Sequence, residues 1–403
     1  MIQPISAIVP VFNAEKYLAD TLASLLNQTV PLLQIIIIDD CSTDKSVEII
    51  RQFCVNNASI EFHQNSQNRG VSYTRNKAVT LVKSQYFLLL DADDLIDSKL
   101  VSKAQDYLVS NKTDILFCAY QQIDENGDSF QGISRFKQVD DSEMLGYEFV
   151  RNQIYLSGTI LKKSTFESYA GFNTQIRICE DWDLWIKFAQ GGHFIYLDEA
   201  LVFIRRHRNN VSANIDEVVE FSKAILNQYS VEFIRSAVYR RNLAAEQNCL
   251  DFVSILYLLG HWEDGFKILI SEISRTNKSL DYRISAKAYF YRGLYYIKSG
   301  DFNQATSQFK KATLTDPDDA ACWNNLGICI LLSSIDNDPS NLAMPNTEVL
   351  AESRECFTKA LSITTSYLDA SFNLKWIEKA VSISDFKVTM KPLRQVLLHY
   401  QKL

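Results

Sequence analysis

Three carboxylates in four residues, Asp91-Ala92-Asp93-Asp94, follow an apolar run that extends from Phe87 to Leu90. The run is typical of a buried strand, and an unpaired carboxylate at its end costs roughly several kcal/mol or shifts its pKa. Carboxylates one residue apart, such as Asp91 and Asp93, present hard oxygen ligands on one side of the chain. The spacing therefore indicates a divalent-cation site with a phosphate on its far side. The alternative is a helix N-terminus, where capping and the helix dipole favour aspartate.

The elements that must position this cluster are short strands alternating with amphipathic helices. Four apolar runs have the composition of strands: Ile5–Val9, Ile35–Ile38, Ile60–Phe62 and Tyr86–Leu90. Continuous apolar strands joined by helices indicate a parallel sheet that is covered on both faces. Ligands of such sheets bind at the carboxyl ends of the strands. We therefore expect Pro10–Asn13, Asp39-Asp40 and Asp91–Asp94 along one rim.

From about residue 215 onward the chain has no strand pattern and contains a repeat. Residues 286–319 span 34 positions and predict a helix, a Gly300-Asp301 turn and a second helix. Phe309-x-x-Ala312 recurs as Phe357-x-x-Ala360 after 48 positions, which is 34 plus 14. The polar stretch 333–347 can hold the additional 14 residues as a loop.

The same landmarks extend beyond these two units. Gly260-His261-Trp262 precedes Gly300-Asp301 by 40 positions and predicts a divergent earlier unit, and a further start is expected at Ala370. Period and landmarks resemble the tetratricopeptide repeat, including Trp323-x-x-Leu326-Gly327. A plain helical bundle is the alternative.

Length and composition exclude several classes of protein. At 403 residues the chain is longer than one usual hydrophobic core, so we expect two domains. A net charge of −7 argues against a nucleic-acid-binding protein. The eight cysteines form no Cys-x-x-Cys pair and are expected to be reduced thiols of a cytoplasmic protein. The apolar runs are too short to cross a bilayer, so no transmembrane segment is expected, and membrane contact would be peripheral at an inner face.

Five segments of the N-terminal half resemble the family 2 glycosyltransferases, and they occur in that family's order. They are Ile8–Asn13, Ile37–Asp44, Asn68–Ser72, Leu90–Asp94 and Glu180–Asp183. The resemblance implies an α/β fold of the GT-A type, with a Rossmann-like, mostly parallel sheet, followed by an all-α repeat solenoid. It places the transferase domain at residues 1–215, a helical linker at 216–245 and the repeats at 246–403.

The resemblance also assigns residues to a nucleotide site. Those expected to line or contact the nucleotide are Pro10, Val11, Phe12, Asn13, Glu15, Asp39, Asp40, Arg69, Arg75, Asp91 and Ala92. Asn13 can also cap a helix that begins near Ala14. Of the two strand-end aspartates, we favour Asp40 as the acceptor of a uracil-like N–H. Arg75 could pair with a diphosphate, orient Asp93 or lie on a solvated surface.

Metal and catalytic residues follow from the same resemblance. Asp93 is expected to coordinate Mn²⁺ or Mg²⁺, with Asp91 beside it and Asp94 as a helix cap. The basic segment Arg205–Arg208 is expected to close the site, with His207 as a third ligand or a diphosphate contact and Arg206 as a diphosphate contact; a solvated basic turn is the alternative.

Asp181 is expected to be the general base, and Glu180 is its partner in the catalytic acid pair; the alternative for both is a capped helix start. Trp182 is expected to stack on a sugar ring, and Gly158 to shape the acceptor side.

These expectations define a metal-dependent inverting transferase. It would move a sugar from a nucleoside-diphosphate sugar, with UDP favoured, to a saccharide, lipid-linked or protein hydroxyl. Its repeats would bind a protein partner. The alternative is a scaffold that binds nucleotide, is catalytically silent and acts through its repeats. A nucleotidyltransferase is disfavoured because Pro10–Asn13 stands where a glycine-rich phosphate loop would be.

Overall fold

The structure is a computed structural model that describes residues 2–109, 112–130, 132–207, 215–273, 281–336, 347–365, 367–379 and 385–390. The chain forms two compact units, residues 1–225 and residues 226–402. Within the described ranges, no helix is both long enough and apolar enough to cross a membrane.

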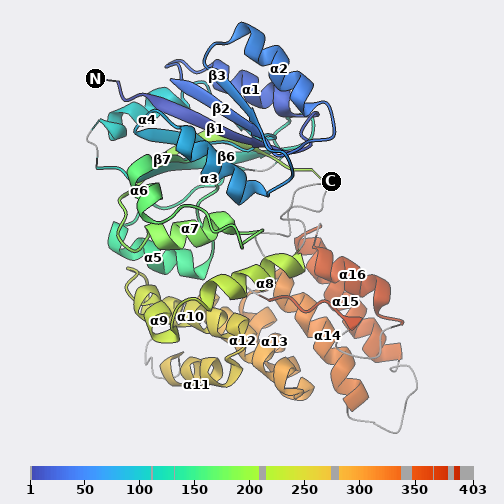
Figure 1. The fold of residues 1–403 in the computed structure, drawn as a ribbon. Helices are drawn as coiled ribbons and strands as arrows, with labels where there is room; N and C mark the ends of the chain where they lie inside the picture. The colour runs from blue at the N-terminus through green and yellow to red at the C-terminus, as the bar shows by residue number, and fades with distance from the viewer. Residues whose placement is uncertain are drawn as a thin grey trace. The chain divides into compact units, whose positions relative to one another are not determined.

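The N-terminal unit is built on one mixed sheet of eight strands in the order β3-β2-β1-β4-β7-β6-β8-β5 (Figure 1). The strands are β1 (Ile5–Val11), β2 (Gln34–Asp39), β3 (Ile60–Gln64), β4 (Tyr86–Leu89), β5 (Leu95–Ile96), β6 (Ile115–Ile123), β7 (Ile160–Lys162) and β8 (Phe194–Arg205). Strands β1 to β4 pair in parallel, as the apolar runs predicted. Strand β7 pairs antiparallel with β4 and β6, and β5 pairs antiparallel with β8, whereas β6 and β8 are parallel.

Helices cover both faces of the parallel half of the sheet. Alternate residues of β1, such as Ile5 and Val9, pack in one core with α1 (Leu18–Leu26) and α4 (Leu100–Leu108). Ile8 of the same strand points to the opposite face of the sheet. On that face α3 (Val71–Leu81) packs against β1 and β2 (Figure 1). The N-terminal unit also contains α2 (Ser46–Asn56), α5 (Asp141–Val150), α6 (Lys163–Ser168), α7 (Glu180–Phe188) and nearly all of α8 (Ile215–Leu226). This double cover explains why the strands are apolar on both sides.

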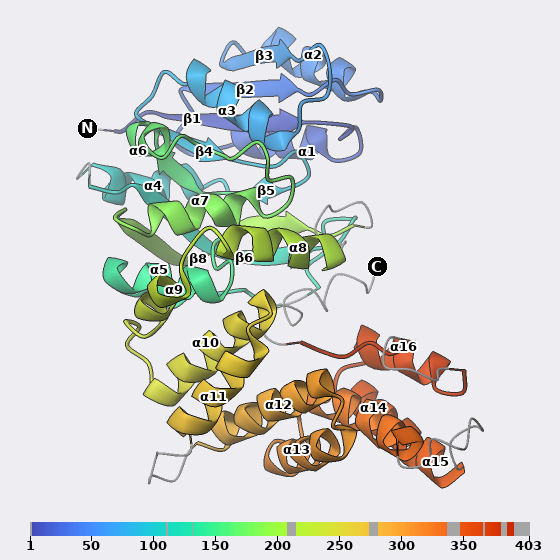
Figure 2. The ribbon, with the colours of Figure 1, turned by 60° about the horizontal axis from the view of Figure 1, so that its bottom comes forward.

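The C-terminal unit consists of helices (Figure 2). They are α9 (Val231–Val238), α10 (Ala245–Leu259), α11 (Trp262–Ile273), α12 (Tyr282–Ser299), α13 (Phe302–Thr315), α14 (Ala320–Asp336), α15 (Thr347–Ile363) and α16 (Leu368–Trp376). Helices α10 and α12 both end at a glycine with positive φ, Gly260 and Gly300, which are the turns expected from the sequence. Of the stretch 333–347 that was expected to form a loop, residues 333–336 belong to α14 and Thr347 begins α15, while residues 337–346 lie outside the described ranges.

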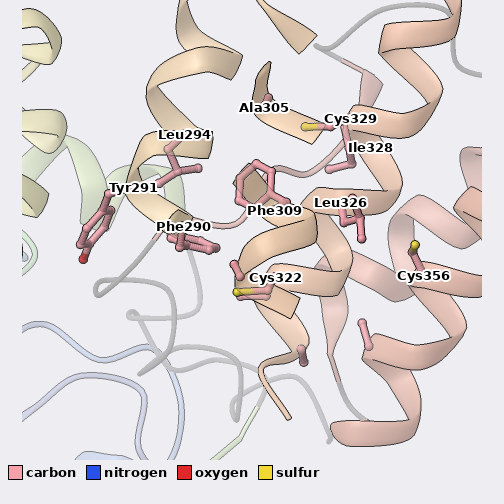
Figure 3. Close-up of a cluster of buried hydrophobic side chains, with 14 of the residues drawn as sticks. Phe290, Tyr291, Leu294, Ala305, Phe309, Cys322, Leu326, Ile328, Cys329 and Cys356 are labelled. Carbon is pink, nitrogen blue, oxygen red and sulfur yellow. The ribbon is translucent and has the colours of Figure 1, made fainter. Parts of the chain in front are cut away.

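One glycine–phenylalanine contact recurs in the two central helix pairs. A Cβ on Gly293 of α12 would lie 2.6 Å from the ring of Phe309 in α13. The equivalent distance from Gly327 of α14 to the ring of Phe357 in α15 is 2.8 Å. The glycines are 34 residues apart, so the small residue lets each helix pair approach equally closely. Phe309 and its apolar neighbours, which include Phe290 and Leu326, form the continuous core of this unit (Figure 3).

Candidate active site

The three aspartates after β4 have three different environments. Asp94 is buried, its Oδ2 accepts a hydrogen bond from Ser157 Oγ at 2.6 Å, and its Oδ1 accepts one from the Arg205 N–H at 2.8 Å. Burial and the neighbouring charges of Asp93 and Asp91 raise the pKa of Asp94 well above its ordinary value. The expectation that Asp94 caps a helix is therefore wrong. Its carboxyl joins the end of β4 to the end of β8.

Asp91 belongs to a chain of ion pairs through a buried arginine. Arg75 of α3 donates from Nη2 to Asp91 Oδ1 at 2.6 Å and from Nη1 to Glu180 Oε1 at 2.5 Å. Burial lowers the pKa of Arg75, but the charges of Asp91 and Glu180 outweigh it and raise the pKa above the ordinary value. The guanidinium also lies over the Phe172 ring at 5.3 Å. The expectations that Arg75 lies on a solvated surface or orients Asp93 were both wrong. Arg75 instead links the acidic cluster to α7.

Asp181 lies in the first turn of α7, beside Glu180. Its side chain is partly exposed, and its Oδ2 accepts a hydrogen bond from Asn152 Nδ2 at 2.9 Å. Removal from water raises the pKa of Asp181 to about 7, and the charge of Glu180 acts in the same direction. A carboxylate with this pKa can accept a proton near neutral pH. Because α7 begins at Glu180, the sequence prediction of a helix start here is also correct.

Trp182 does not face a ligand. It is 2% exposed, and its Nε1 donates to the main-chain oxygen of Glu148 on α5 at 2.6 Å. The expectation that Trp182 stacks on a sugar is wrong, because packing between α5 and α7 occupies the ring. The Glu148 carboxyl is itself buried, which raises its pKa well above the ordinary value. The sequence analysis missed Glu148, although its position in Tyr147-Glu148-Phe149 placed a charge between two aromatic residues.

Asp93 faces the segment that follows β8. Asp93 Oδ2 lies 2.8 Å from His207 Nε2, and the His207 ring stacks on Tyr17 with centroids 5.0 Å apart. The Arg205 guanidinium lies 4.7 Å from the centre of the same Tyr17 ring. Tyr17 was not among the expected site residues. The one sequence feature that could have indicated it is its position directly before α1.

Arg206 was expected to contact a diphosphate, and the structure contradicts this. Its side chain is 2% exposed, and its Nε donates to Gln122 Oε1 at 3.0 Å. The guanidinium lies over the Tyr155 ring at 5.3 Å. Arg208, at the end of the same basic segment, lies outside the described residues.

Asp39 and Asp40, at the end of β2, differ in how many of their carboxylate oxygens have a hydrogen-bond partner. The Asp40 carboxylate accepts from the main-chain N–H groups of Arg69 and Gly70, at 2.9 Å and 2.8 Å, and from Asn65 Nδ2 at 2.8 Å. Asp39 Oδ2 accepts from Ser42 N–H at 3.1 Å, but the buried Oδ1 finds no hydrogen-bond partner among the described residues. Asp40 thus fixes the loop before α3, and the unused acceptor is on Asp39, not on the favoured Asp40.

The segment after β1 is tied to the loop after β2. Asn13 has φ of 49°, and its Oδ1 accepts from Thr43 N–H at 2.8 Å. Glu15 Oε2 accepts from Lys45 N–H at 2.9 Å. Because α1 begins at Leu18, the prediction that Asn13 caps a helix starting near Ala14 is wrong.

Around this segment, the other residues expected to line the nucleotide differ in exposure and contacts. Pro10 and Val11 belong to β1, and the next residue in the sequence, Phe12, is 50% exposed. The Arg69 guanidinium lies over the Tyr73 ring at 4.5 Å.

Two small residues complete the cluster's surroundings. The Ala92 main-chain oxygen accepts from Thr21 Oγ1 at 3.0 Å, so it holds the turn to α1. Gly158 has φ of 85°, and a Cβ there would lie 2.1 Å from Val202 Cγ2. Its N–H donates to the Leu89 oxygen at 2.8 Å. Ala92 thus ties the turn after β4 to α1, and Gly158 ties its own segment to β4.

The described residues contain no group of three His, Cys, Asp or Glu side chains arranged to hold a metal ion. Asp91, Asp93 and His207 do not form a closed cage, since Arg75 holds Asp91 and His207 pairs with Asp93. Carboxylate oxygens nonetheless suit Mg²⁺ or Mn²⁺, which use one or two protein carboxylates together with substrate phosphates. The donor set fits an ion that arrives with a diphosphate.

Comparison with known proteins gives the two parts of the chain separate relatives. Residues 6–175 match the model of glycosyl transferase family 2, and residues 286–319 match that of the tetratricopeptide repeat. An uncharacterized glycosyltransferase of Methanocaldococcus jannaschii is 29% identical over 220 residues, 52% of this chain and 74% of that protein. An uncharacterized glycosyltransferase of Haemophilus influenzae is 24% identical over 316 residues, 76% of this chain and 95% of that protein. The crystal structure of S. aureus TarS 1-349 in complex with UDP-GlcNAc gives a TM-score of 0.49 at 18% identity, over 77% of this chain and 91% of that chain.

Proposed function

Because the N-terminal part of this chain is a family 2 glycosyltransferase domain followed by a tetratricopeptide repeat, we propose that it is an inverting transferase. It would move a sugar from a nucleoside-diphosphate sugar to a hydroxyl acceptor in one displacement. The acceptor oxygen bonds to the anomeric carbon while the bond from that carbon to the diphosphate breaks. Asp181 accepts the proton that the hydroxyl loses.

The observation that carries this proposal is the environment of Asp181. It is partly exposed, it is oriented by Asn152, and its pKa is raised to about 7. Glu180 beside it is connected through Arg75 to Asp91 by direct ion pairs. Asp181 is thus adjacent in the sequence to a chain of ion pairs that reaches the acidic cluster. A retaining enzyme would instead need a nucleophilic carboxylate, about 5 Å from the acid by analogy with glycoside hydrolases.

We propose that the nucleotide lies over the ends of β1 and β2. Asp39 Oδ1 is a buried acceptor without a partner among the described residues, and such atoms are rare unless a ligand or water uses them. Uracil and guanine both carry a ring N–H that can donate to a carboxylate, and the resemblance to family 2 glycosyltransferases favours uracil and hence a UDP-sugar. The exposed ring of Phe12 adjoins this rim and offers a stacking surface.

We propose Asp93 as the metal ligand, with Asp91 beside it. His207 either orients Asp93 through its hydrogen bond or serves as a further ligand. When bound, Mg²⁺ or Mn²⁺ neutralises charge on the leaving diphosphate. The chain's own contribution is to fix the carboxylates. Arg75 orients Asp91, and the Asp94–Ser157 hydrogen bond holds the turn that carries Asp93.

The experiment is a transfer assay on the purified chain with UDP- and GDP-sugars, Mg²⁺ or Mn²⁺, and saccharide, lipid-linked and peptide acceptors. We expect transfer with inversion. Asp181→Asn should lower kcat by roughly 10²–10⁴-fold while nucleotide affinity is kept. Asp93→Ala should abolish the metal dependence of nucleotide binding.

The matched control is Asp198→Asn, a surface aspartate paired with Arg135, which should leave transfer unchanged. If Asp181→Asn transfers as well as the unaltered chain, Asp181 is not the base. Calorimetry separates the second candidate, a catalytically silent nucleotide-binding scaffold. That candidate requires nucleotide binding without transfer to any acceptor.

A further inference from the structure

Residues 386–390, here called the C-terminal strap, cross α14 and α16 of the repeat unit. Residues 387–390 are neither helix nor strand, while Phe386 and Thr389 are buried and Lys387 is exposed. Three asparagines of the two helices, Asn324, Asn325 and Asn373, contact the strap, and each is 0% exposed. We call these three residues the asparagine clamp. A buried amide is costly unless it is paired, so their partners show what they are for.

Two clamp residues pair with the main chain of the strap in the same way. Asn373 accepts from the Lys387 N–H at 2.7 Å and donates to the Lys387 oxygen at 3.1 Å. Asn325 accepts from the Thr389 N–H at 2.9 Å and donates to the Thr389 oxygen at 3.1 Å. Each side-chain amide thereby takes both hydrogen bonds of one residue, and the residues are two apart. A neighbouring strand contacts an extended peptide in this pattern.

The third clamp residue supports the other two. Asn324 Nδ2 donates to the Lys387 oxygen at 3.0 Å, and Asn324 Oδ1 accepts from Asn373 Nδ2 at 2.8 Å. Because these contacts involve main-chain groups of the strap, they are available to any extended peptide of L-residues. They carry no side-chain preference at the position of Lys387, whose side chain is exposed.

Other positions of the strap do select a side chain: Phe386 belongs to the hydrophobic core of the unit, Val388 and Met390 pack against that core, and Thr389 makes polar contacts. The Thr389 Oγ1 donates to Asp369 Oδ2 at 2.7 Å and lies 2.7 Å from the Tyr367 hydroxyl. Asn324 Nδ2 lies 3.3 Å from the same oxygen. A hydroxyl fills this buried pocket, whereas an apolar group of the same size would leave Asp369 and Tyr367 without that partner.

From this geometry we propose that the asparagine clamp is a binding site for an extended peptide with serine or threonine at the position of Thr389 and apolar residues at those of Phe386 and Val388, occupied here in cis by the strap. The partner is a segment of another protein that reproduces the strap's main-chain pattern and displaces it. A tethered segment competes at an effective concentration of about millimolar, so the strap sets a threshold that a partner must exceed. This inference does not depend on the transferase chemistry proposed above.

The test uses a fluorescent, acetylated and amidated peptide of residues 385–390 and the full chain carrying Thr389→Pro. Proline removes the N–H that pairs with Asn325 and the hydroxyl, so the strap leaves the clamp. We expect saturable binding at least about tenfold tighter than to the unaltered chain. Adding Asn325→Leu to the Thr389→Pro chain should weaken binding by about tenfold or more. Absence of binding to a Thr389→Pro chain with unaltered circular dichroism overturns the proposal.

Variants of the peptide test the hydroxyl pocket. Serine at the Thr389 position should keep the affinity, and Thr389→Val in the peptide should lower it by about tenfold. Equal affinity of the valine peptide contradicts the proposed preference for a hydroxyl.

Amide exchange on the unaltered, ¹⁵N-labelled chain gives a measurement that does not require a variant to fold. Excess unlabelled peptide should accelerate exchange of the Lys387 and Thr389 amides and leave those of α14 unchanged. If the two strap amides exchange at the same rate with and without peptide, the strap is a fixed part of the core and the proposal fails.

Discussion

The Arg75 chain of the N-terminal unit and the asparagine clamp of the C-terminal unit are both buried polar networks, but one is charged and the other is neutral. Arg75 holds Asp91 and Glu180 by ion pairs at 2.6 Å and 2.5 Å. Asn325 and Asn373 hold two main-chain amide units with hydrogen bonds of 2.7–3.1 Å. Each network joins segments that are far apart in the sequence.

The difference lies in what each network can respond to. Buried charges cost several kcal/mol, roughly, if a partner is lost, and they shift the pKa of their neighbours, which a proton-transfer site requires. The amides of the clamp bind main-chain groups, which do not titrate, and their hydrogen bonds cost less to break. They suit a contact that one peptide can take over from another. The two networks therefore differ in chemistry: one fixes buried charges, and the other binds main-chain amide groups.

The largest expected effect is on the charged network. Arg75→Met leaves Asp91 and Glu180 without their shared partner and should lower the free energy of unfolding by about 3–5 kcal/mol. Denaturant titration of the chain measures it. Arg177→Met is the matched control, because Arg177 pairs with Glu217 in an exposed position and should cost about 0–1 kcal/mol. Equal losses in the two variants would remove the distinction between the buried and the exposed pair.

A smaller effect is expected in the neutral network. Asn325→Leu removes both hydrogen bonds to Thr389 and should cost about 1–3 kcal/mol, as unpaired amide groups do. Thermal unfolding in low and high salt should give the same loss, since salt does not screen hydrogen bonds between uncharged groups. The exposed Gln304 on α13 supplies the control, and Gln304→Leu should change stability by about 0.5 kcal/mol at most. A loss from Asn325→Leu that disappears in high salt would contradict the neutral assignment.

The smallest expected effect is a shift in pH dependence. The proposed base acts when Asp181 is deprotonated, so kcat/KM should rise with pH through about 7. The Glu180 charge raises the pKa of Asp181, and the Asn152 hydrogen bond lowers it. Glu180→Gln should therefore move the acid limb to lower pH, and Asn152→Ala should move it to higher pH. Shifts in one direction for both variants would show that another group controls the profile.

The strands and the repeat were predictable from the sequence because local patterns determine them. The first four strands are apolar on both sides, and residues 286–319 carry the landmarks of one 34-residue repeat unit. Strands β5 to β8 were not predicted. Strands β5 and β7 have only two and three residues, and they pair with strands that are distant in the sequence.

Residue types predicted the candidate site's members better than their roles. Arg75 and Trp182 have side chains that suit a ligand contact, yet both are committed to protein partners. Asp94 could be distinguished from Asp93 only once Ser157 and the end of β8 were placed beside it. The asparagine clamp has no sequence signature. The contacts of Asn324, Asn325 and Asn373 with residues 387 and 389 are seen only in the folded chain.

The repeated glycine–phenylalanine contact has a consequence for how this chain can change in length. Phe357 meets Gly327 as Phe309 meets Gly293, although 14 more residues separate the former pair. The entropy of closing a loop grows only logarithmically, by about 0.6 kcal/mol for each doubling of its length. Additional residues between α14 and α15 are therefore expected to cost little stability. A variant lengthened at this position should keep the packing of Phe357 on Gly327.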